Sequence, residues 1–138
     1  MPPRRRTDPA AGRTAVAAWV LGEAERRDVT TAVRFTLEEL ADHAPGNSVE
    51  VRVPPSGAVQ AVAGPRHTRG TPPNVVETDP DTWLGLVTGT VAWADAVTDG
   101  RVRASGERSD LSHLLPLTAG RRAASGALGE PEPPAVPG

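Results

Sequence analysis

The sequence predicts an α+β fold, and three observations support this prediction. Valine alternates strictly with charged residues in VEVRV at 49–53, which is typical of a half-buried strand. Val33, Leu37 and Leu40 recur at helical spacing. Further strand patterns then precede helix patterns, and one strand returns near residue 102, an order typical of a layered α+β domain.

Two amphipathic helices are expected first. Asp8 followed by Pro9 is a favourable helix start, and the apolar residues that follow share one face up to Gly22: Val16, Trp19 and Val20. Asp28 or Thr30 is expected to cap the second helix, which presents Phe35 on a separate face and closes at Pro45–Gly46. Neither helix can bury its apolar stripe alone, so both imply a surface to lie on.

The strands come next. The turn PPSG leads from 49–53 to a hairpin partner at 58–63, where Val59 and Val62 have opposite parity and leave room for a bulge. The connection GPRHTRGTPPN at 64–74 joins the hairpin to a short strand at 74–78. Residues 101–104 alternate again and predict a last strand.

Three shorter helices complete the expected elements. Asp79 and Pro80 repeat the first helix start, with Trp83, Leu84 and Val87 on one side before Gly89. A helical segment carrying Trp93, Ala96 and Val97 ends at Gly100. Ser109 or Asp110 is expected to cap a last helix whose stripe consists of Leu111, Leu114 and Leu115.

The domain is expected to span residues 8–117, between tails at 1–7 and 118–138. The second tail holds too little large apolar side chain to offset the entropy of ordering it. Both tails are therefore predicted to be disordered.

The composition limits the function classes. A net charge of −2 argues against nucleic-acid binding, and the absence of cysteine excludes disulfides and thiolate ligands. All 15 basic residues are arginine, a bias that follows GC-rich codons and suggests an actinobacterium. No stretch approaches the length of a membrane span, so we expect a cytoplasmic protein.

The segment 77–117 resembles the C-terminal half of sterol carrier protein type two domains. The family's characteristic positions fall on five residues of this sequence: Asp79, Gly89, Ala96, Gly100 and Gly106. The whole chain resembles the short, standalone actinobacterial members of that family. The resemblance implies a mainly antiparallel sheet of about five strands covered on one face by helices, with a cavity between the layers. Trp93 replaces the helix-leading proline of the family and adds bulk near that cavity.

Two candidate sites follow, each with an alternative. Apolar residues would line a pocket for a lipid-like or fatty-acyl ligand, or simply form the core: Phe35, Val51, Trp83, Leu84, Val87, Trp93, Val97, Leu111 and Leu114. Arg66, His67 and Arg69 would clamp an anion, or would only be neutralised by the nearby carboxylates Glu77, Asp79 and Asp81.

No motif for metal, nucleotide or nucleophilic chemistry is present, and only His67, His113 and Asp110 are considered as metal ligands. We therefore expect no cofactor, no metal and no enzymatic activity. The leading hypothesis is hydrophobic-ligand binding by a monomer or weak dimer. The alternatives are an accessory domain that contacts an actinobacterial enzyme, and anion-metabolite binding through the 66–69 loop.

Overall fold

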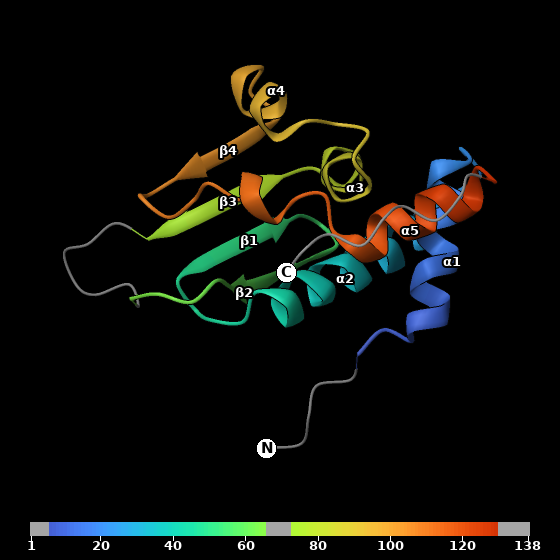
Figure 1. The fold of residues 1–138 in the computed structure, drawn as a ribbon, viewed down its shortest axis with the longest axis horizontal. Helices are drawn as coiled ribbons and strands as arrows, with labels where there is room; N and C mark the ends of the chain where they lie inside the picture. Colours follow the sequence, from blue (N-terminus) through green and yellow to red (C-terminus); the bar gives the residue numbers. More distant parts are fainter. Residues whose placement is uncertain (1–5, 66–72, 130–138) are drawn as a thin grey trace.

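The computed structural model describes residues 6–65 and 73–129 and has an α+β architecture (Figure 1). Its strands form one sheet: β1 (Val49–Val53), β2 (Gly57–Ala61), β3 (Asn74–Thr78) and β4 (Val102–Ser105). Its helices are α1 (Pro9–Val20), α2 (Arg26–His43), α3 (Pro80–Thr88), α4 (Trp93–Thr98) and α5 (Thr118–Ala127). The predicted fold class is confirmed.

The sheet has the strand order β2-β1-β3-β4. β1 pairs with β2 antiparallel and with β3 parallel, and β3 pairs with β4 antiparallel. The sheet is therefore mainly antiparallel as expected, although the described residues contain four strands and not about five. β2 and β4 are its edge strands.

One face of the sheet is buried and the other is open to solvent. The register places Val51 beside Val59 of β2 and Val76 of β3, and Val51 and Val76 are fully buried. The opposite face carries charged side chains, among them Arg103, which contacts Glu77 at 2.9 Å. In Figure 1, α1, α2, α3 and α5 gather on one side of the strands, while α4 lies beyond the β4 edge.

The first two helices form as their end signals indicate. The Asp8 carboxylate accepts a hydrogen bond from the Ala11 amide at 3.2 Å, and Pro9 opens α1. α2 begins earlier than expected, because Glu25 and Asp28 form a reciprocal capping box and Asp28 is already the third helical residue. A Cβ atom at Gly12 would overlap the Phe35 ring, so α1 and α2 approach closely there.

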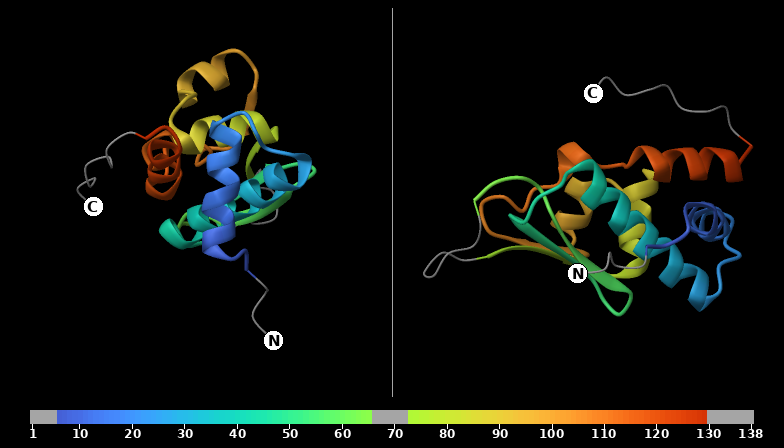
Figure 2. Two further views of the ribbon diagram at one scale, coloured as in Figure 1. Left: turned by 90° about the vertical axis from the view of Figure 1, so that its right-hand side faces the viewer. Right: turned by 90° about the horizontal axis from the view of Figure 1, so that it is seen from below.

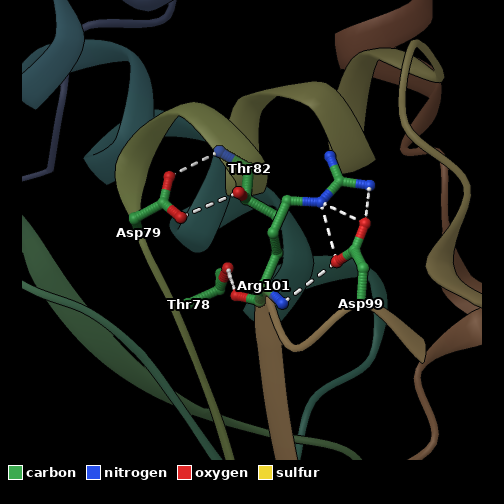
Figure 3. Close-up of polar contacts among 5 residues, drawn as sticks. All are labelled: Thr78, Asp79, Thr82, Asp99 and Arg101. Carbon is green, nitrogen blue, oxygen red and sulfur yellow. Dashed lines mark hydrogen bonds and ion pairs between the residues drawn. The ribbon is translucent and has the colours of Figure 1, made fainter. Parts of the chain in front are cut away.

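α3 confirms the second Asp-Pro start (Figure 3). The Asp79 carboxylate accepts hydrogen bonds from the Thr82 amide and hydroxyl, both at 2.8 Å. Gly89 ends the helix with φ of 92°, a left-handed conformation that glycine adopts without strain. These caps fix where β3 ends and where Trp83 enters the core.

The C-terminal region differs from its prediction. The last expected helix is only a 3₁₀ turn at Ser112–Leu114, followed closely by Pro116, which lacks the amide needed to continue a helix. Residues Thr118–Ala127, expected to belong to a disordered tail, form α5, which lies across α1 in Figures 1 and 2.

α5 is buried through small residues and not through large apolar ones. Its buried residues are Gly120, Ala123 and Ala124. The Leu117 amide donates to the Val87 carbonyl at 3.1 Å, and a Cβ atom at Gly120 would overlap that same carbonyl. Close backbone approach therefore takes the place of bulky side chains, which explains why composition alone did not predict this helix.

Candidate functional site

Most residues predicted to line a pocket lie in the packed core. Six are at most 3% exposed: Phe35, Val51, Trp83, Leu84, Val87 and Leu111. Trp93 and Leu114 are half-buried, whereas Val97 is 40% exposed because α4 turns Ala96 inward in its place. None of the nine residues lines the grooves described below. Their contact with a ligand stays a prediction.

Trp83 shows how tightly this interior is filled. The indole is fully buried, and its Nε1 donates a hydrogen bond to the Thr36 hydroxyl of α2 at 2.9 Å. Thr36 in turn donates to the Ala32 carbonyl at 2.8 Å. The ring thus joins α3 to α2 with its polar atom satisfied.

The arginine and histidine cluster, Arg66, His67 and Arg69, lies outside the described residues. The carboxylates considered as its neutralising partners have other roles. Glu77 contacts Arg103 at 2.9 Å, Asp79 caps α3, and Asp81 accepts a hydrogen bond from the Trp19 indole at 2.9 Å. These contacts join β4 to β3, cap α3, and join α1 to α3.

A groove lies between α2 and the edge strand β2, which lie beside each other in Figure 1. We call it the α2–β2 groove. It encloses about 550 Å³, and ten residues line it: Arg6, Arg34, Leu37, Glu38, Ala41, Asp42, Ser56, Gly57, Ala58 and Val59. A smaller hollow of about 290 Å³ shares Ala41, Ala58 and Val59 with it and extends it to Glu50 and Gln60.

Helical spacing and an edge strand together build this groove. Leu37 and Ala41 lie one helical turn apart on the side of α2 that faces β2, since both line the same hollow. At the other wall, the Leu37 and Arg34 side chains lie over Gly57, at 3.6 and 3.8 Å from where a Cβ atom would sit, which is ordinary van der Waals contact. The floor is therefore apolar, with Val59 contributed by the strand.

The rim of the groove carries ordered charges. The Arg34 Nε donates to the Ser56 carbonyl at 3.0 Å. Arg6 contacts Asp42 at 2.7 Å, and the hydrogen bond to Asp42, together with its charge, raises the pKa of Arg6. The Thr7 amide donates to both Glu38 oxygens at 3.1 Å. The N-terminal segment is thus fastened to the α2 wall.

A second cleft, of about 440 Å³, lies at the β3–α3 junction and is partly drawn in Figure 3. Its arginines already bind carboxylates: Arg101 contacts Asp99 at 2.8 Å, and Arg103 contacts Glu77. The hydrogen bond from Arg101 lowers the pKa of Asp99. These charges stabilise the β4 start and present no unpaired cation to an anionic ligand.

Residues 6–65 and 73–129 contain no group of three histidines, aspartates or glutamates placed to hold a metal ion. Within the same ranges, no helix has both the length and the hydropathy to cross a membrane.

The α2–β2 groove was not among the predicted sites. Its signal was present in the spacing of Arg34, Leu37, Glu38 and Ala41 along one helix. What sequence could not show was that this side of α2 would lie at an edge of the sheet.

Comparison with known proteins gave one family. The family described as "Bacterial SCP ortholog" matches residues 25–117, more than half of the chain. The matched range runs from the N-cap of α2 to Leu117 and includes both walls of the α2–β2 groove. No curated protein matches the chain.

Proposed function

This chain belongs to the bacterial SCP ortholog family, a sterol carrier protein-like family, and on that premise we propose that it binds a hydrophobic small molecule in the α2–β2 groove without catalysing a reaction. The observation that carries the proposal is the groove itself, with its apolar floor between a helix and an edge strand.

The size and chemistry of the groove suit a small amphiphile. Its volume of about 550 Å³ lies within the range of roughly 300–1,000 Å³ that is common for ligand sites. Ala41 and Val59 are partly exposed and supply apolar surface beside the buried Leu37, while charged side chains and the buried Ser56 line the same groove. Binding would be driven by removing apolar ligand surface from water, at about 25 cal/mol per Å².

The packed interior favours the groove over a site between the layers. The core residues Trp83, Leu84 and Val87 are fully buried, and the indole already has its hydrogen-bond partner. A ligand placed among them would have to displace core contacts, at a cost of several kcal/mol. A ligand in the groove displaces only solvent.

Filling the groove should weaken ligand binding. We expect Ala41→Trp to weaken binding of decanol by at least about tenfold, equivalent to ~1.4 kcal/mol, because the indole occupies the space shared by both hollows. Isothermal titration calorimetry measures this, with thermal unfolding as a check on folding.

Ala10→Trp is the matched control, since Ala10 is exposed on α1 and lines neither hollow. Equal affinities of both variants and the parent protein would refute the groove as the site. Native mass spectrometry of freshly purified protein should also show a co-purified ligand, which Ala41→Trp should lack.

A further inference from the structure

We infer that Arg34 makes the α2–β2 groove selective for amphiphiles with a carboxylate head. The head would bind beside Ser56, and the chain would run over Leu37 and Ala41 towards Gln60. This inference rests on the proposed function, because it specifies the ligand of the same groove.

Arg34 is held in place for such a role. Its Nε donates to the Ser56 carbonyl at 3.0 Å, and its stem lies against Gly57. A guanidinium carries five N–H donors, so this one bond leaves its two terminal nitrogens to receive a planar carboxylate. Among the residues that the structure describes, no carboxylate lies within ion-pair distance of Arg34.

The nearest carboxylate in sequence is directed elsewhere. Glu38 lies four residues after Arg34 on α2, a spacing at which opposite charges normally meet. However, the Thr7 amide donates to both Glu38 oxygens and the Thr7 hydroxyl donates to Oε1 at 3.2 Å. Asp42 is similarly engaged by Arg6. The N-terminal segment therefore keeps both acidic groups of this wall away from Arg34.

The two ends of the groove differ in charge, which orients the ligand. Arg34 stands at the end where β2 begins, beside Ser56 and Gly57. The opposite end, reached through the smaller hollow, carries Glu50, whose carboxylate is bound by Arg52 and Gln60. An anionic head is attracted to Arg34 at the first end, whereas the paired Glu50 and Arg52 offer it no net positive charge at the second, so the alkyl chain extends from Arg34 along the groove.

Calorimetric titration with decanoate and decanol tests the inference, because the two probes share a chain and differ in the charge of the head at pH 7. The parent protein should bind decanoate about tenfold more tightly than decanol, as a charge-assisted hydrogen bond predicts. Arg34→Gln should remove that difference, because it weakens decanoate binding more than decanol binding. Arg34→Lys, which keeps the charge without the planar donor geometry, should retain an intermediate preference.

Arg27→Gln is the control, since Arg27 lies on the same helix and lines neither hollow. A preference for decanoate that survives Arg34→Gln, or equal binding of the two probes by the parent protein, would overturn the inference and leave groove binding intact. Failure of the parent protein to bind either probe would refute the proposed function itself.

Discussion

Trp83→Ala should lower the free energy of unfolding by about 3–5 kcal/mol, the range for truncating a fully buried large aromatic side chain. The loss combines the transfer free energy of the indole with the cavity left between α3 and α2. The hydrogen bond to Thr36 would also be lost, although Thr36 keeps the Ala32 carbonyl as a partner. Urea unfolding followed by far-ultraviolet circular dichroism measures the change.

Trp93→Ala serves as the comparison, because Trp93 is only half-buried. Trp93→Ala should lower the free energy of unfolding clearly less than Trp83→Ala does. If Trp83→Ala cost under about 1 kcal/mol, the ring would not be packed as a core residue, and a ligand space around it would become the better interpretation.

Gly120→Ala is expected to destabilise the protein by about 1–3 kcal/mol, even though alanine is the better helix former, because the added methyl group overlaps the Val87 carbonyl. The helices would have to separate, at the point where the Leu117 amide binds that carbonyl. Thermal and urea unfolding measure the effect.

The same substitution at Gly126 provides a control on the same helix. A Cβ atom there meets nothing within 4 Å, so Gly126→Ala should stabilise the protein by up to about 1 kcal/mol. If the two substitutions change the free energy of unfolding in opposite directions, α5 is docked on α3. Stabilisation by both variants would show that Thr118–Ala127 does not pack against α3 as described.

Short-range sequence signals predicted most helices and strands, whereas the features that depend on tertiary contacts were not predicted. The Asp-Pro starts at Asp8 and Asp79 and the alternation at 49–53 are short-range features, and the structure confirms all three. The hairpin partner was placed correctly but ends at Ala61, where the chain turns and Val62 takes a positive φ of 68°. These features depend only on residues that are close in the sequence, so a single sequence is enough to predict them.

The features that were missed depend on residues far apart in the chain. The parallel pairing of β1 with β3 and the docking of α5 on Val87 have no local signature. The α2–β2 groove arises because β2 is an edge strand, which depends on the order of the whole sheet. Most apolar candidates were recognised as inward-facing residues, with Val97 on the exposed side of α4 as the exception, but burial alone does not distinguish a core from a ligand wall.

The central claim is that the ligand lies in the α2–β2 groove and not among the core residues. Titration of isotopically labelled protein with decanoate, followed by amide chemical shifts, tests it most directly. We expect the shifts to change around Arg34, Leu37, Ala41 and Val59, with little change at Trp83, Leu84 and Leu111. Changes centred on those three core residues, or no saturable change at all, would contradict the account.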